Sequence, residues 1–583
     1  MKVFENESNG GDITNAYALD DDCFDLLPTL PLPVFSIEQI PSQLDFPVIH
    51  ENTHRYGFEN LDAIPLSDMH TWLLPVVSAR DISRAGTSLH KAGATDVDSY
   101  ILLVRNLIKS SGVYALSAIA TPLVSLALAP FLTRSLSPTD YGVLTILSTA
   151  ISLGAGVTQM GLGTAFFLAY NYDYTSGSDR RSILATTTLL LCLLSIPVVV
   201  GVAIGAPYLA GLLLGRTSLG DLIIIAAGVV FAQNLAVPGF AWLRAESRAL
   251  FYSLLSISNL LITLLANLVL VGVFHWGIAG SLVAMGLGYA STMLCTIPII
   301  LLHGGASIRV DIARSMLAFG APLVLNVVSY WVLQVLDRYL LSRFGSLAQT
   351  AMYAVVYTLG SALSVVIIAP FTLAWPTAMF AIAKRDDAPQ VFRLLFRWLC
   401  MILLFSAFGL SLAGQVLLDW LFPASYHAEA MIIPVIAVSI TFYGMYFMLM
   451  IGTNIKRKTW LGGVFVFIAA VVNTALNLVL IPHYGAMGAA IATLAAYIVL
   501  AAIAYVVNQR IYPIPFEIDI FTAALLVGTV LYLGNEFLAR SQNTYISWGI
   551  TVITVGLYAG VLLLLVKLPA RAVSRRNWKQ IEK

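Results

Sequence analysis

Long apolar stretches alternate with short polar connections from residue 110 to residue 567. A transmembrane helix needs about 20 mostly apolar residues to cross the hydrocarbon core of a bilayer. By that criterion the pattern predicts fourteen spans, with limits at 110–132, 141–168, 182–205, 221–243, 250–274, 277–302, 315–341, 348–380, 392–414, 429–452, 460–482, 485–507, 518–538 and 545–567. We therefore expect an all-α fold, a polytopic membrane protein with about 14 transmembrane helices.

Two stretches depart from a simple span. Residues near 206–215 are apolar but too short to cross a bilayer, so we expect an interfacial segment there. The stretch 348–380 is long and contains Pro370 and Pro376. Because proline removes a helical N–H donor, we expect these residues to kink the helix.

The composition agrees with a membrane protein. Hydrophobic residues make up 58% of the 583 residues and charged residues only 11%, whereas soluble domains contain about 25% charged residues. This composition excludes an ordinary soluble enzyme, a basic nucleic-acid-binding domain and a secreted disulfide scaffold. The four cysteines lie too far apart in the sequence to suggest a metal site or a redox pair.

The charged residues are unevenly distributed along the chain. Residues 1–100 contain 5 Lys or Arg and 16 Asp or Glu, and the remainder contains 27 and 15. We expect residues 1–104 to form an acidic, disordered cytoplasmic tail and residues 568–583 to form a basic cytoplasmic tail. The acidic tail is either a docking segment for a basic partner or a dispensable extension. Deletion of residues 1–100 is predicted to leave membrane insertion and activity intact.

Positive charges gather on alternate connections between the predicted spans. Connections on the side of the acidic tail carry 22 Lys and Arg residues, and the opposite connections carry 5. Connections rich in Lys and Arg stay in the cytoplasm. We therefore expect a multi-pass membrane protein with an even number of spans and both termini in the cytoplasm.

An internal repeat relates two parts of the chain. The motif at 267–280 (NLVL, then HWGIAG) recurs at 477–488 (NLVL, then HYGAMG), and Arg248 and Lys458, which open the matching helices, are 210 positions apart. A repeat of six helices preserves their orientation, so the two halves should be parallel. We expect six-helix bundles at 105–305 and 306–510, followed by two additional helices at 511–567.

Polar residues recur along one face of the span at 315–341. Asn326, Tyr330, Gln334 and Arg338 are spaced by four residues, and Asp337 adjoins Arg338. Twelve residues at about 100° each leave a net rotation of about 120°, so the four share one broad face. Because polar groups that face lipid are costly, this face should line the bundle interior or a watery cavity.

Asn259 in the fifth span and Tyr357 in the eighth lie in similar polar stripes. Such groups can line a cavity that binds a hydroxyl-rich sugar, or they can hydrogen-bond neighbouring helices to one another. Arg338 is the best candidate for contact with an anion, since a guanidinium matches the oxygens of a phosphate. Alternatively, Arg338 pairs with Asp337 at the outer interface.

The connections leave little room for catalysis. None of those after residue 105 exceeds roughly 20 residues, and their acidic residues have no acid–base partner nearby. We therefore expect a protein that is not an enzyme, with no catalytic residues, no metal site and no cofactor.

The segments 109–114 (KSSGVY) and 129–142 (APFLTRSLSPTDYG) resemble the opening of the polysaccharide and O-antigen flippase family. Asp337-Arg338-Tyr339 and the run at 473–490 also fit this family, and the resemblance covers roughly residues 105–510. The superfamily also contains multidrug exporters of the MATE type and the peptidoglycan-precursor flippase. The acidic tail departs from the family pattern.

The resemblance implies that the protein moves an undecaprenyl-diphosphate-linked oligosaccharide from the inner to the outer leaflet of the inner membrane. It also implies alternating access, a cationic central cavity and a role in O-antigen, capsule or exopolysaccharide biosynthesis. The implied partners are this substrate, membrane lipids and polysaccharide polymerase or export proteins, with no nucleic acid. One alternative is a MATE-type exporter of drugs or metabolites. A less favoured one is a membrane enzyme of polysaccharide assembly.

Overall fold

The computed structural model describes Val124 and residues 127–174, 176–246, 248–303, 308–539 and 544–567, all of which belong to a compact unit of residues 64–583. Every regular element in these residues is a helix, which confirms the predicted all-α fold. The two expected tails lie outside the described residues, as does most of the first predicted span.

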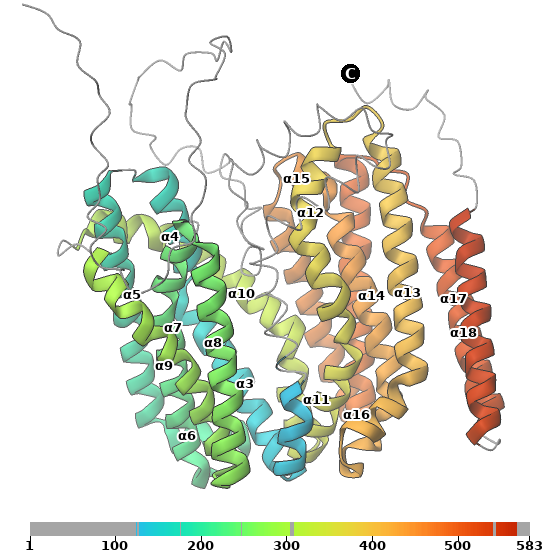
Figure 1. Cartoon of the computed structure of the whole chain (residues 1–583), viewed down its shortest axis with the longest axis horizontal. Helices are drawn as coiled ribbons and strands as arrows, with labels where there is room; N and C mark the ends of the chain where they lie inside the picture. Colours follow the sequence, from blue (N-terminus) through green and yellow to red (C-terminus); the bar gives the residue numbers. More distant parts are fainter. Residues whose placement is uncertain are drawn as a thin grey trace, which may run out of the picture. The chain divides into compact units, whose positions relative to one another are not determined.

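The first group of helices follows a helical segment at residues 127–135 and packs largely on itself, with α7 and α8 both against α9 (Figure 1). Its elements are α3 Pro138–Gln159, α4 Leu162–Leu168, η3 Ala169–Asp173, α5 Gly177–Ile204, α6 Ala206–Leu214, η4 Thr217–Leu219, α7 Gly220–Ala245, α8 Ala249–Asn267, η5 Leu268–Val273 and α9 Gly277–His303. We call this group the first bundle.

The second group begins with α10, which packs most extensively against α16. Its elements are α10 Val310–Phe344, α11 Leu347–Gly360, η6 Ser364–Ile368, α12 Ala369–Ile382, α13 Ala388–Leu421, η7 Ala424–Ile432, α14 Ile433–Leu449, α15 Ile451–Ile455 and α16 Trp460–Ile511. We call this group the second bundle. Two further helices, α17 Ile518–Ala539 and α18 Thr544–Lys567, complete the described chain.

Twelve helical stretches among the described residues are long and apolar enough to cross a bilayer. The longest covers Trp460–Ile511, 52 residues, which at about 1.5 Å per residue is more than twice the thickness of a hydrocarbon core. It changes direction at Gly485, where φ is 55° and ψ is −132°, so it makes two crossings. These crossings match the predicted spans at 460–482 and 485–507.

Gly485 has a counterpart in the first bundle. Gly277, at the matching position of the sequence repeat, also has a positive φ of 59°. Glycine adopts this left-handed conformation without a steric penalty from a side chain. Both glycines therefore have a positive φ at the start of the second helix of the repeated motif, and the relation between the halves stays a prediction.

The short segment near residue 206 and the span that contains Pro370 and Pro376 both differ from a simple membrane-spanning helix. Residues 206–214 form the short helix α6, separate from the spans on either side, as expected. The span predicted at 348–380 is interrupted at η6, a π-helical turn that ends at Ile368, two residues before Pro370. Pro376 lies inside α12, which continues past it to Ile382.

Because each span crosses once, the connections alternate between two faces of the molecule. We call the face that carries the connections near residues 176, 248, 309, 385, 457 and 512 the basic face, and the other the opposite face. At the opposite face α3 of the first bundle packs against α11 of the second, and α10 of the second bundle also contacts α3, α4 and α5. A Cβ atom on Gly142 would lie 2.0 Å from the carbonyl oxygen of Leu347, and Arg134 donates to the carbonyl of Leu421 at 3.3 Å.

The additional helices α17 and α18 lie side by side and contact α13 (Figure 1). Arg397 of α13 donates to both carboxylate oxygens of Glu517, just before α17, and to the carbonyl of Val566 in α18 at 2.9 Å. The side chains of Arg397 and Glu517 are 5% and 10% exposed, so the ion pair is buried. This pair anchors both helices at the basic face.

Candidate substrate-binding site

A cavity of about 550 Å³ lies between the two bundles, and we call it the central cavity. Its walls come from α3, α7, α10, α12 and the segment formed by α14 and α15. Five of the lining side chains are amides, namely Gln159, Gln233, Asn326, Gln334 and Asn454. An amide both donates and accepts hydrogen bonds, as a sugar hydroxyl requires.

The described residues that line the central cavity include no Asp, Glu, Lys or Arg. The cationic cavity that the family resemblance implies is therefore not what these residues form. Uncharged amides recognise hydroxyl groups without attracting an ion, so this part of the cavity suits a neutral, hydroxyl-rich group.

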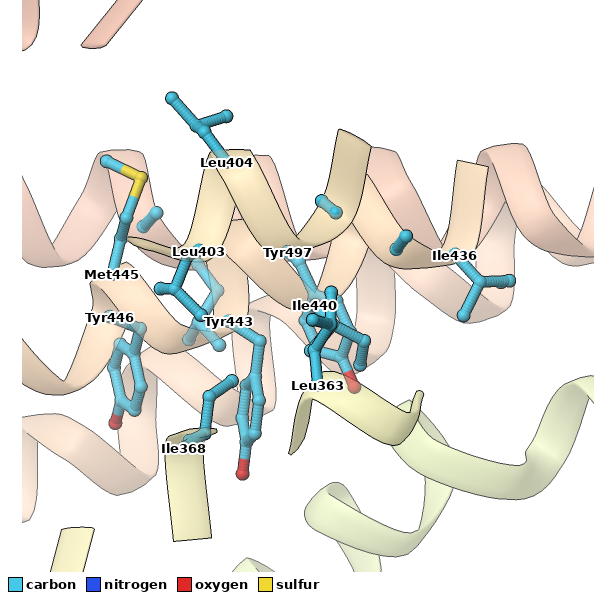
Figure 2. Close-up of a cluster of buried hydrophobic side chains, with 14 of the residues drawn as sticks. Leu363, Ile368, Leu403, Leu404, Ile436, Ile440, Tyr443, Met445, Tyr446 and Tyr497 are labelled. Atoms are coloured by element: carbon cyan, nitrogen blue, oxygen red, sulfur yellow. The ribbon is translucent and has the colours of Figure 1, made fainter. Parts of the chain in front are cut away.

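Aromatic side chains also line the central cavity. Tyr330 of α10 and Tyr443 of α14 hydrogen-bond through their hydroxyl groups. Figure 2 shows the rings of Tyr443 and Tyr446 leaving α14 in the same direction. The hydroxyl of Tyr446 and the indole N–H of Trp375 are buried and have no hydrogen-bond partner among the described residues. An unmade buried hydrogen bond is costly, so these two groups are under-satisfied in this conformation.

Three of the four residues in the predicted polar stripe of α10 line the central cavity, and the last one does not. Asn326, Tyr330 and Gln334 line the central cavity, whereas Arg338 is absent from its wall. The net rotation of about 120° along the stripe explains the difference, because it turns the last side chain away from the cavity and toward α11.

Arg338 lies in a cluster with Asp337 and two tyrosines of α11. Its guanidinium donates to the carbonyl of Gln334 at 2.9 Å and lies over the ring of Tyr357, 4.5 Å from the ring centroid. Asp337 accepts a hydrogen bond of 2.5 Å from the Tyr353 hydroxyl, and its carboxylate is 3.7 Å from the guanidinium. The side chain of Arg338 is 12% exposed and is paired with Asp337 in this conformation, as in the alternative interpretation of the sequence.

Asn259 lies outside the central cavity. Its amide donates to the hydroxyl of Thr292 at 3.1 Å and so joins α8 to α9. This hydrogen bond agrees with the interhelical role that the sequence left open as an alternative. Binding of substrate by the predicted residues, Asn259 included, remains a prediction.

The sequence did not single out Gln159, which ends α3. Its amide donates to Asn234 at 3.1 Å, and Asn234 donates to Thr158 at 2.6 Å and to Ser195 at 2.8 Å. This buried network joins α3, α5 and α7. Gln159 belongs to no polar stripe, so only the packing of these three helices reveals it.

A second cavity of about 190 Å³, which we call the side cavity, adjoins the central one. Gln159 and Gln233 line both. The side cavity is also lined by Thr164, Tyr252 and Arg244, and Arg244 is the one charged residue among the described residues that line either cavity. No group of three or more His, Cys, Asp or Glu side chains in the described part of the chain could hold a metal ion.

Comparison with known proteins gives the following results. A family model described as polysaccharide biosynthesis protein matches residues 131–431. A search of curated proteins found no match. The structure of the lipid II flippase MurJ in an inward closed conformation matches with a TM-score of 0.63 at 14% identity, over 76% of this chain and 98% of that one. A mutant of the MATE transporter VcmN from Vibrio cholerae matches with a TM-score of 0.51 at 13% identity, over 74% and 98%. At these identities the likeness shows a shared fold.

Proposed function

Because this chain belongs to the polysaccharide biosynthesis protein family, whose model matches more than half of its residues, we propose that it is a flippase for a lipid-linked oligosaccharide. Its substrate is an oligosaccharide on undecaprenyl diphosphate, which it moves from the inner to the outer leaflet of the inner membrane. The product supplies O-antigen, capsule or exopolysaccharide biosynthesis.

The chemistry of the central cavity carries this proposal. Its five amide side chains offer hydrogen bonds to sugar hydroxyls. Its aromatic side chains offer flat faces to sugar rings. We propose that Asn326, Tyr330 and Gln334 contact the oligosaccharide.

The contacts between the bundles supply a route for alternating access. Under the proposed topology, in which the basic face is cytoplasmic, the contacts between α3 and α11 close the outer side. Movement of the substrate to the outer leaflet requires α3 and α11 to separate. Arg338 lies between the central cavity and this closed side, so we propose that it contacts the substrate only after α3 and α11 have separated.

The experiment uses a strain that lacks this protein but makes a lipid-linked oligosaccharide and has no second flippase. Lipids are extracted, identified by mass spectrometry and assigned to a leaflet. We expect the intermediate to accumulate in the cytoplasmic leaflet and the intact gene to reverse the accumulation. Absence of accumulation would contradict the proposal and favour an exporter of another solute, such as a drug or metabolite.

A matched pair of variants tests the central cavity itself. Gln334→Leu removes an amide from the cavity wall, whereas Gln415→Leu makes the same change on the exposed surface of α13, where Gln415 bonds to Asp419. We expect only Gln334→Leu to slow flipping at equal protein level. Equal activity of the two variants would remove Gln334 from the site.

A further inference from the structure

Two helices present matching faces to the two cavities. Five positions of α7 line the side cavity. The five positions that lie 210 residues later, in the segment formed by α14 and α15, line the central cavity. The pairs are Gln233 with Tyr443, Ala236 with Tyr446, Val237 with Phe447, Phe240 with Met450, and Arg244 with Asn454. The shared spacing of 3, 4, 7 and 11 residues from the first member places each set on one face of a helix.

This correspondence uses the same offset that separates Arg248 from Lys458 at the starts of the following helices. Arg244 therefore occupies, in the first bundle, the position at which Asn454 faces the central cavity in the second bundle. The side cavity adjoins the central cavity, because Gln159 and Gln233 line both.

Arg244 is the charged residue among the described residues that line the side cavity. It is partly buried in the last turn of α7, where the negative end of the helix dipole stabilises its positive charge. Two residues further on, Glu246 accepts a hydrogen bond of 2.5 Å from Tyr170, whose ring lies 4.9 Å from the guanidinium of Arg180.

We propose that the side cavity binds the diphosphate of the lipid-linked substrate through Arg244, while the oligosaccharide occupies the central cavity. This inference rests on the proposed function and assigns the two parts of that substrate to different cavities. A guanidinium presents two parallel N–H groups to phosphate oxygens. The hydroxyl of Thr164, which lines the same cavity, can donate to a further oxygen.

The test measures binding of undecaprenyl diphosphate and of undecaprenol to the full-length protein in lipid nanodiscs. We expect the wild type to prefer the diphosphate. Arg244→Ala should weaken diphosphate binding about tenfold or more, because a hydrogen bond to a charged group is lost. Arg244→Lys should weaken it less, since the charge stays but the fork is lost. Undecaprenol binding should not change.

Arg314→Ala is the matched control, because it removes the same charge from an exposed residue near the basic face. Equal diphosphate affinity of Arg244→Ala, Arg314→Ala and the wild type would overturn the inference. If Arg244→Ala does not fold, as judged by thermal unfolding, Arg244→Lys decides the question, and unchanged affinity there would also overturn it.

The outcomes separate this inference from the proposed function. A wild type that shows no preference for undecaprenyl diphosphate over undecaprenol contradicts both. A preference that persists in the Arg244 variants and disappears in Arg338→Ala contradicts only the assignment to Arg244. Inorganic pyrophosphate, added as a competitor, should displace the lipid weakly. Binding of pyrophosphate without binding of the diphosphate lipid would assign the side cavity to a free anion and refute the inference.

Discussion

Gly142 is the residue whose replacement should separate the two bundles at the opposite face. It allows α3 to approach α11 so closely that an added Cβ would lie 2.0 Å from the carbonyl oxygen of Leu347 and 2.7 Å from its carbonyl carbon. These are backbone atoms, so no side-chain rotation relieves the overlap. Gly142→Ala should therefore force the ends of α3 and α11 apart by about 1.4 Å before the contact becomes ordinary.

The expected magnitude follows from this overlap. Overpacking of a close contact costs typically about 1–3 kcal/mol. The cost applies only to the state in which α3 and α11 are in contact, because the state with the opposite face open has no such overlap. At about 1.4 kcal/mol for each factor of ten, Gly142→Ala should raise the ratio of the open to the closed state by about 5-fold to 140-fold.

The assay measures access to the central cavity from outside the cell. Gln334→Cys is introduced into a chain without its native cysteines, and an impermeant maleimide is added to the outer side of spheroplasts. Gly142→Ala should speed labelling by the factor given above. Gly320→Ala is the matched control, since its Cβ would lie 2.1 Å from the carbonyl oxygen of Met160, a similar overlap at a contact between α10 and the turn that follows α3.

Gly228→Ala is a second control, because nothing lies within 4 Å of the added Cβ. Both controls should leave labelling from outside at the wild-type rate. The reasoning is refuted if Gly142→Ala labels no faster than the wild type at equal protein level. It is also refuted if Gly320→Ala produces the same increase, since the effect would then be general loosening.

Three further substitutions test other parts of the structure. Arg338→Ala should impair flipping in the leaflet assay and Arg338→Lys should restore it in part, because lysine keeps the charge without the planar fork; full activity of Arg338→Ala would exclude a role. Glu517→Gln should lower the free energy of unfolding by about 3–5 kcal/mol, since it leaves Arg397 buried without its counter-charge, and thermal unfolding in detergent should show a lower midpoint than for the wild type. Asn234→Ala should cost about 1–3 kcal/mol, because Ser195 and its neighbours lose a buried partner; an unchanged unfolding midpoint would contradict the importance of that network.

The positions of the spans could be predicted from the sequence because the bilayer imposes one simple requirement on every crossing. The stretch predicted at 250–274 corresponds to α8 and η5, which end at Val273, and the stretch predicted at 518–538 to α17. Gly277 and Gly485, which stand at matching positions of the repeat, both adopt a positive φ. These features depend on local composition and on residues close in sequence.

The walls of the cavities could be predicted only in part, because they depend on which helix faces which. Asn326, Tyr330 and Gln334 belong to a stripe whose period is visible in the sequence, and they line the central cavity. Gln159 is a single amide in an otherwise apolar stretch, and Trp375 reads as an ordinary apolar residue. Their places in the wall follow from the packing of the two bundles, which no local pattern encodes.

The correspondence between the two cavities explains why a repeated architecture can handle a substrate with two unlike ends. A strictly symmetric pair of halves would offer the same chemistry twice. At matching positions this chain instead carries Gln233 and Arg244 in the first bundle and Tyr443 and Asn454 in the second. If the diphosphate binds the first bundle and the oligosaccharide binds mainly the second, a rocking motion of one bundle against the other changes the distance between the two parts of the site. The substrate would then be held most tightly in one relative position of the bundles, and its release would be coupled to their separation.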